Sequence, residues 1–232
     1  MRKTLFVADL HLHVSETAKW QCFVNWITGL TKQAESQPDA LYILGDLFRF
    51  FVGDDATSEM VIAIRQALSR LNAKVPVYFI RGNRDFLLGE TFAAGCFKIL
   101  PELASVNLYG RNTILTHGDN LCRKDIRYRI FRVVVQSRLA RMAFRVLPVF
   151  LREFAANLVQ RNFKHPDKII VDYRWLSRQM DIKHASQAIY GHLHQYYIKD
   201  YNGRREICVP SWDEGAKWLV YNEDHSFSIA KT

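Results

Sequence analysis

The chain has 232 residues, 49% of them hydrophobic, and a formal net charge of +9 at pH 7. That length and apolar content suffice for a full hydrophobic core. No Pro/Gly/Ser-rich linker, repeat or low-complexity tract divides the chain, and no uninterrupted apolar stretch is long enough to span a bilayer. These features exclude repeat and membrane-spanning classes and predict a single domain over residues 1–232.

The predicted elements alternate between short apolar runs and longer amphipathic stretches. Strands are expected at residues 3–9, 40–45, 76–82, 112–117 and 187–191. Helices are expected at about 16–36, 57–72 and 167–182. Hairpin turns are expected around Asn202 and Gly203 and near residues 222–224. The order predicts an α/β fold with a partly parallel sheet and crossover helices.

Two features indicate the cellular compartment. Asp9 interrupts the apolar run near the amino terminus, so this segment is interpreted as a first strand and not as a signal peptide. The cysteines show no C-x-x-C spacing, which predicts free thiols in a reducing cytosol. These are Cys22, Cys96, Cys122 and Cys208. We therefore expect a cytoplasmic protein.

Polar side chains able to bind a metal ion follow each of five predicted strands. They are Asp9 and His11, Asp46, Asn83, His117, and the pair His192 and His194. Because open sheets present ligands at the carboxyl ends of their strands, five distant segments can converge on one spot. Each fragment alone is a weak signal, since Gly-Asp after a strand is commonly a turn or a helix cap. Their joint occurrence in this order indicates a two-metal centre.

The residue types match the chemistry of such a centre. Two divalent ions about 3.5–4 Å apart need a bridging anionic oxygen, with imidazoles and further oxygens around each ion. Asp46 is expected to bridge the two ions. One ion would be completed by Asp9, His11 and His194, and the other by Asn83, His117 and His192. A water between the ions would be deprotonated near neutral pH and placed for in-line attack on phosphorus.

The run of motifs D-x-H, G-D, G-N, H-G and G-H-x-H resembles the calcineurin-like metallophosphoesterase superfamily. Most of its members carry histidine after G-N, whereas this chain has Arg84. That departure, together with G-N-R-D-F-L-L-G and D-x-x-Y-x-x-F-R, is similar to the UDP-2,3-diacylglucosamine diphosphatase family of lipid A biosynthesis. The resemblance extends from Leu5 to about Leu219.

The resemblance implies a four-layer αββα sandwich with a helical insertion, or cap, over the active site. It implies two divalent ions, for which we expect Mn²⁺. The implied reaction is hydrolysis of the diphosphate of UDP-2,3-diacylglucosamine to UMP and 2,3-diacylglucosamine 1-phosphate. The candidate catalytic residues are Asp46, Arg84 and His117.

Arg84 has a physical interpretation of its own. A guanidinium stays charged at neutral pH and cannot serve as a general acid. Cleavage of a phosphoanhydride needs little acid assistance, because the leaving group is itself a phosphate, and an arginine suits that task as a clamp on the diphosphate. The alternative is a surface ion pair between Arg84 and Asp85.

The basic residues are concentrated in one segment. From Arg123 to Lys168 the sequence has twelve Lys and Arg and three Asp and Glu, which accounts for the whole net charge. We place a helical insert at about 122–166, in which Pro148 is expected to kink or divide the helix. Aliphatic side chains alternate with the basic ones. On a helical projection, one face carries Arg127, Arg138, Arg141, Arg145 and Arg152.

An amphipathic, basic helical hairpin suits an anionic membrane surface, with its aliphatic residues dipping into the interface. The prediction is peripheral association with the cytoplasmic face of the inner membrane, and no protein partner is expected. One alternative is a helical subdomain with a solvated basic face. Nucleic-acid binding is disfavoured, because aromatic platforms for unpaired bases are scarce among the interleaved residues.

The family resemblance also implies substrate contacts. They comprise Asn83, Arg84 and His192 near the metals, Asp125, Tyr128 and Arg132 in the D-x-x-Y-x-x-F-R stretch, and Lys164 and Lys168 further on. Departures from the family pattern occur at Arg49, at Phe163 and in G-H-L-H-Q-Y. Another diphosphate or phosphodiester substrate, and a non-enzymatic membrane-binding module, therefore stay open as alternatives.

Overall fold

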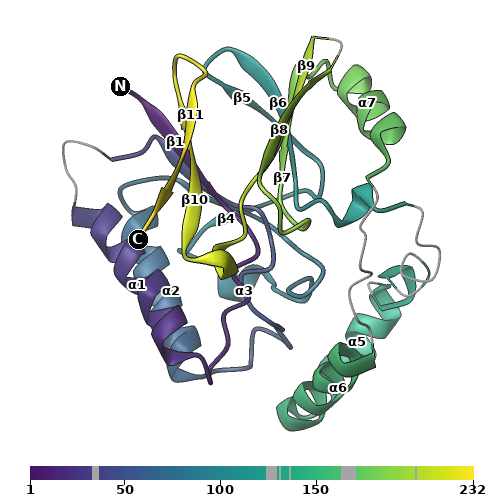
Figure 1. The fold of residues 1–232 in the computed structure, drawn as a ribbon. Coiled ribbons are helices and arrows are strands. Elements are labelled where there is room, and N and C mark those ends of the chain that lie inside the picture. The colour runs from purple at the N-terminus through teal and green to yellow at the C-terminus, as the bar shows by residue number, and fades with distance from the viewer. Residues whose placement is uncertain (33–36, 124–129, 131, 136, 163–170, 202) are drawn as a thin grey trace.

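The computed structural model describes residues 1–32, 37–123, 130, 132–135, 137–162, 171–201 and 203–232. Within these ranges two β-sheets face each other and helices cover their outer sides (Figure 1). The six-stranded sheet has the order β11-β10-β1-β2-β3-β4, and the five-stranded sheet has the order β5-β6-β7-β9-β8. This arrangement confirms the expected αββα sandwich.

The six-stranded sheet is built mainly from parallel strands. Its strands are β1 (Lys3–Val7), β2 (Ala40–Ile43), β3 (Val77–Ile80), β4 (Lys98–Leu100), β10 (Lys217–Asn222) and β11 (Phe227–Lys231). β1 to β4 pair in parallel, while β10 pairs antiparallel to β1 and β11 antiparallel to β10. The crossovers contain α1 (Thr17–Lys32), α2 (Glu59–Asn72) and the short α3 (Glu90–Ala93).

The sequence of α2 shows why a crossover helix forms and packs here. Ser58 caps the helix by accepting a hydrogen bond from the backbone N of Val61 at 3.3 Å, and Glu59 stands in the first turn, where its charge favours the helix dipole. Apolar residues at helical spacing form one buried face. They are Met60, Val61, Ile64, Ala67, Leu68 and Leu71.

The five-stranded sheet is mixed. It consists of β5 (Ala104–Leu108), β6 (Arg111–Thr116), β7 (Gln187–Tyr190), β8 (Tyr197–Tyr201) and β9 (Arg204–Cys208). β6, β7 and β9 are parallel, while β5 and β8 run antiparallel at the two edges. The helix α7 (Tyr173–Ile182) covers its outer face, and short 3-10 turns lie at η1 (Asp119–Leu121) and η2 (Trp212–Glu214).

The apolar core between the sheets fixes the register of the strands. Phe6 of β1, Leu115 of β6, Ile189 of β7 and Leu219 of β10 are fully buried in one cluster. Burying such a side chain contributes roughly 1.5–3 kcal/mol, and a one-residue slip would turn each of them to the other face of its sheet. The carboxyl ends of the strands are therefore held in a defined relationship.

The predicted elements agree with the structure at most positions. All five predicted strands and all three predicted helices have counterparts, although the strands end one or two residues earlier, where a loop begins. The prediction missed α3, β4 and β5, which are short and carry weak periodicity. The expected helix ends at 33–36 and 167–170 lie outside the described residues.

The predicted insert contains α5 (Arg138–Val146) and α6 (Val149–Asn162), which lie away from the two sheets (Figure 1). Pro148 separates them, as predicted, because it cannot continue a helix. Arg152, which the helical projection places on the basic face, is not solvated, since only 1% of this residue is exposed. Among the described residues, none of the helices combines the length and apolar character needed to cross a bilayer.

Candidate metal centre

The candidate ligands follow five strands, β1, β2, β3, β6 and β7, on short loops with an unusual backbone. Five of these residues have a positive φ between 47° and 68°: Asp9, His11, Asp46, His192 and His194. Residues other than glycine rarely adopt this left-handed conformation, which costs of order 1–3 kcal/mol each and is found mainly where function requires it. The loops therefore turn sharply, and their side chains point to one place.

Backbone hydrogen bonds hold these loops together. The amides of Leu10 and His11 both donate to the carbonyl of Asp46 at 2.9 Å, which joins the loop after β1 to the loop after β2. On the other sheet, the amide of Gly191 donates to the carbonyl of His117 at 2.8 Å. Such bonds compensate for the strained backbone and preorganise the side chains.

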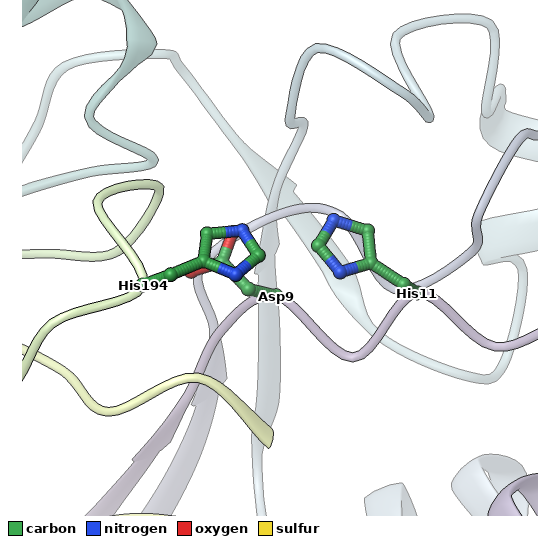
Figure 2. A group of neighbouring side chains, drawn as sticks. All are labelled: Asp9, His11 and His194. Carbon is green, nitrogen blue, oxygen red and sulfur yellow. The ribbon is translucent and has the colours of Figure 1, made fainter. Parts of the chain in front are cut away.

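One group of donors comprises Asp9, His11 and His194. Their ligand atoms all lie within 4.8 Å of one another. Figure 2 shows the imidazoles of His11 and His194 directed toward each other from two chain segments, with the Asp9 side chain close to His194. The rings stack with their centroids 5.1 Å apart. The structure thus brings together the three residues that were predicted to complete one ion.

A second group comprises Asp9, Asp46 and His117, again with ligand atoms within 4.8 Å of one another. Asp46 Oδ2 lies 3.2 Å from Nε2 of His11, and Asp46 Oδ1 lies 3.7 Å from Nε2 of His117. Asp46 therefore stands between one imidazole of each group. This is the placement that a bridging carboxylate requires.

The remaining two predicted ligands also lie at this centre. Asn83 Oδ1 is 3.0 Å from Nε2 of His117. The ring centroid of His192 is 4.9 Å from that of His117, and the backbone N of His192 donates to Asp9 Oδ2 at 2.7 Å. All seven predicted ligands are thus gathered at one site.

Neighbouring groups orient the imidazoles. Nδ1 of His117 donates to the carbonyl of Leu44 at 2.7 Å, which leaves Nε2 facing the centre. Nδ1 of His11 lies 2.6 Å from Oδ2 of Asp213, which is also paired with Lys19. A hydrogen bond on the outer ring nitrogen fixes the ring and raises the basicity of the inner one.

Asp213 and Lys19 were not predicted as site residues. Asp213 lies in η2, 202 residues from its partner His11, and no motif in the sequence connects the two. Although burial alone lowers the pKa of His11, its hydrogen bonds to Asp213 and Asp46 raise it to about 9. Burial raises the pKa of Asp213, but the bonds to His11 and Lys19 outweigh it and bring that pKa to about 2.

Asp85 connects the loop after β2 to the loop after β3 through buried hydrogen bonds. Its carboxylate is completely buried and accepts hydrogen bonds from the amides of Leu47 and Gly82, each at 2.7 Å. Burial, with the nearby charge of Asp46, raises the pKa of Asp85 to about 7. The alternative of a surface ion pair between Arg84 and Asp85 is therefore wrong.

Arg84 is held by Asp46 instead. Its backbone N donates to Asp46 Oδ1 at 2.9 Å, and its Nε lies 3.4 Å from Asp46 Oδ2. Burial favours the protonated form of Asp46, but His117, His11 and Arg84 hold its pKa well below the usual range. A fixed positive charge thus stands beside the candidate metal ligands.

The donor set fits divalent cations. Asp9 is fully buried, and its Oδ1 has no hydrogen-bond partner among the described residues. Leaving a buried carboxylate oxygen unsatisfied costs about 1–3 kcal/mol, and a cation would satisfy it. Burial also raises the pKa of Asp9 to about 6. Carboxylate, carboxamide and imidazole donors suit borderline divalent metals.

Glycines give the donors the space they occupy. A Cβ added at Gly82 would lie 2.2 Å from Asp46 Oδ1, and one added at Gly191 would lie 2.9 Å from Asp9 Oδ2. Contacts below 3.0 Å force a shift of the neighbouring atoms. The glycines of the G-N and G-H-x-H motifs are thus required by close packing around the two carboxylates.

The structure describes only some of the predicted substrate contacts. Nε of Arg132 lies 2.9 Å from Asp119 Oδ2, and its Nη2 donates to Glu102 at 2.8 Å. Asp119 is buried two residues after His117, so Arg132 reaches the border of the centre. Four further predicted contacts lie outside the described residues: Asp125, Tyr128, Lys164 and Lys168.

A two-sheet sandwich with buried carboxylates and imidazoles at its strand ends is the architecture of a metal-dependent phosphoesterase. The chain belongs to the calcineurin-like phosphoesterase family, whose sequence profile matches residues 2–223. Accordingly, the chain is a hydrolase of a family that uses divalent metal ions.

Curated relatives match nearly the whole chain. A protein of Shewanella sp. (strain ANA-3) named UDP-2,3-diacylglucosamine hydrolase is 36% identical over 231 residues, covering 96% of this chain and 95% of that protein. A protein of Vibrio atlanticus with the same name is 33% identical, covering 94% and 93%. The solved structure of an archaeal phosphodiesterase matches with a TM-score of 0.52 at 10% identity over 98% of both chains, which supports the fold alone.

Proposed function

We propose that this chain hydrolyses the diphosphate of UDP-2,3-diacylglucosamine to UMP and 2,3-diacylglucosamine 1-phosphate, a step of lipid A biosynthesis. The observation that carries the proposal is the gathering of six candidate metal ligands around a seventh, Asp46, with Arg84 beside them. The relatives named for the same substrate support the choice of diphosphate.

The proposed metal ligands are the two groups described above. Asp9, His11 and His194 would hold one ion, while Asn83, His117 and His192 would hold the other, with Asp46 between them. When bound, two divalent ions supply Lewis acidity to a phosphoryl group and acidify a water molecule. We propose Mn²⁺ as the ion, and the carboxylate and carboxamide oxygens of Asp9, Asp46 and Asn83 are donors that suit it.

The role proposed for Arg84 is electrostatic. Its Nε is held 3.4 Å from Asp46 Oδ2. The guanidinium would neutralise charge on the diphosphate as the bond breaks. The departing group is a phosphate of low pKa, so it needs no proton from the chain. A catalytic acid at this position is therefore unnecessary.

The proposed membrane contact lies on α5 and α6. Leu139, Met142 and Val146 of α5 are 66–85% exposed, and Phe150 and Phe154 of α6 are each 67% exposed. Apolar side chains of this size seldom gather on a surface that faces only water. With the surrounding arginines they suit the anionic, cytoplasmic surface of the inner membrane, where the acylated substrate resides.

The test is direct. Purified protein with Mn²⁺ is mixed with UDP-2,3-diacylglucosamine, and UMP and the lipid phosphate are identified by mass spectrometry. Asp46→Asn serves as the inactive comparison, with its fold checked by circular dichroism. Release of UMP by the wild type alone supports the proposal. Turnover of a simple aryl phosphodiester without UMP release would instead assign another phosphodiester substrate.

A further inference from the structure

Arg152 of α6 contacts the loop after β2 through its guanidinium. It belongs to the helical insert, yet its side chain is only 2% exposed. Nη1 donates to the carbonyl of Val52 and to Asp55 Oδ1, each at 2.8 Å, and Nη2 donates to Asp55 Oδ2. Nε donates to the carbonyl of Leu147 at 2.9 Å. Arg152 thus forms a two-bond fork with one carboxylate and ties both helices to the loop after β2.

The backbone around Asp55 is shaped for this contact. Gly53 has a φ of +144°, and a Cβ added there would lie 2.4 Å from Nη1 of Arg152 and 2.7 Å from Asp55 Oδ1. Only glycine leaves room for the guanidinium at this point. The Arg152 guanidinium is therefore closely enclosed at Gly53, whereas the Asp55 side chain that it contacts is 61% exposed.

The same loop also holds the segment that carries Arg84. The amide of Phe51 donates to the carbonyl of Arg84 at 3.0 Å, one residue before Val52. Asp54, next to Asp55, accepts hydrogen bonds from the amides of Gly89 and Thr91 at 2.8 and 3.1 Å. Residues 51–55 therefore contact both the helical insert and the loop that carries Arg84.

A second contact joins the insert to the body of the fold. Phe144 of α5 packs against the apolar cluster under the six-stranded sheet. The insert is therefore held to the rest of the described structure by the ion pair of Arg152 with Asp55 and by the apolar packing of Phe144.

We propose that Arg152 and Asp55 are a positioning pair, which sets the placement of α5 and α6 relative to Arg84 and so governs how the acylated part of the substrate meets the centre. This inference rests on the proposed lipid-linked substrate. Neither residue needs to touch the diphosphate, because each charge is already compensated by the other. Because the pair would act on the binding of the acylated part and not on the diphosphate itself, its loss should appear mainly in KM.

The first experiment tests, in the absence of substrate, whether the pair of Arg152 and Asp55 anchors the insert. Amide hydrogen exchange is compared for the wild type, Arg152→Ala and Arg70→Ala, with Arg70 chosen as an exposed arginine of α2. We expect exchange in residues 138–162 to rise at least about tenfold in Arg152→Ala, because buried anchors suppress local opening. Arg70→Ala should match the wild type. Unchanged exchange in Arg152→Ala would overturn the pairing as an anchor.

The second experiment measures turnover of UDP-2,3-diacylglucosamine by the same proteins. Arg152→Ala is expected to raise KM about tenfold to a hundredfold, with Mn²⁺ affinity by calorimetry unchanged. Arg152→Lys should recover part of the loss, since it keeps the charge but not the fork. A parallel loss of Mn²⁺ affinity, or an unaltered KM, would contradict a positioning role.

The two proposals fail in different ways. If the wild type releases no UMP, the proposed substrate is wrong, and the exchange experiment still decides whether the pair anchors the insert. If the wild type releases UMP and Arg152→Ala equals it in both KM and exchange, the positioning pair is wrong and the proposed function stands.

Discussion

The backbone N of His192 donates to Oδ2 of Asp9 across 2.7 Å, so the loop after β7 is fastened to the loop after β1. The two residues are 183 positions apart and come from different sheets. Because this bond occupies Oδ2, the other carboxylate oxygen of Asp9 is left directed to the centre, where it has no hydrogen-bond partner among the described residues. Asp9 thus links the sheets and offers a ligand atom.

Replacing Asp9 by asparagine separates these two tasks. The amide oxygen can still accept from His192, whereas the negative charge is lost. We expect Mn²⁺ affinity to fall at least about a hundredfold, while the metal-free protein becomes more stable by about 1 kcal/mol, because a buried charge is removed. Calorimetric titration and urea unfolding measure the two effects. Tight Mn²⁺ binding by Asp9→Asn would contradict the ligand role.

A methyl group at Gly82 tests the packing around Asp46. Its Cβ would lie 2.2 Å from Asp46 Oδ1 and 2.5 Å from the backbone N of Asp46. We expect Gly82→Ala to lower the free energy of unfolding by about 1–3 kcal/mol and to impair metal binding.

Gly29 in α1 provides the matched control for that variant. Nothing lies within 4 Å of a Cβ added there, and alanine favours a helix over glycine by about 0.5–1 kcal/mol. Gly29→Ala should therefore leave metal binding intact and raise the unfolding free energy. Equal effects of the two variants in urea unfolding would show that crowding at Asp46 is unimportant.

Metal uptake should release a proton from His11. Its pKa is raised from 6.5 to about 9, so in the metal-free protein the imidazole is charged at pH 7.5. A metal ligand must be neutral, so binding displaces that proton, and the release should vanish near pH 10. In the metal-free protein, the hydrogen bonds of protonated His11 to Asp213 and Asp46 stabilise the fold. This contribution to the free energy of unfolding is complete below pH 6.5 and is lost as the pH rises through about 9.

Calorimetry in buffers of different ionisation enthalpy measures the released proton. Asp213→Asn supplies the comparison, because it removes the charge that holds the His11 pKa up. We expect this variant to release fewer protons for each bound metal ion at pH 7.5 than the wild type does. The same release in both proteins would show that Asp213 does not control His11.

Arg84 is expected to act by charge and not by proton transfer. Arg84→Met should lower kcat about a hundredfold to a thousandfold, as removal of a preorganised electrostatic contact does elsewhere, with Mn²⁺ affinity retained. The pH dependence of kcat separates the roles. Arg84→His should introduce an ionisation near neutral pH, because an unperturbed imidazole titrates there. An unchanged kcat in Arg84→Met would remove the clamp from the mechanism.

Local signals explain the successful predictions. Each candidate ligand stands within four residues of the end of a strand that an apolar run predicts, so Asp46 after β2 and His117 after β6 could be picked out from the pattern. The break at Pro148 was predictable because proline cannot continue a helix. By contrast, β4 and α3 have three and four residues, too short for a periodic pattern to develop.

Burial of charged side chains was not predictable from neighbouring residues. Arg152 falls on the basic face of a helical projection. In the structure it instead donates hydrogen bonds to the carboxylate of Asp55, which is 97 positions away in the loop after β2. Asp85 follows Arg84 directly, yet it turns inward to bind two amides. A helical projection shows which side chains share a face of the helix. It does not show which other segments of the folded chain contact that face.

The sequence by itself determined which residues end the strands, in what order they come, and that their donor atoms suit divalent metals, because these properties reside in adjacent residues. The tertiary structure alone decided that Asp213 orients His11 and that Arg152 anchors the insert. Those contacts depend on which distant loops meet once two sheets have packed, and the energy that selects them comes from burial across the whole core.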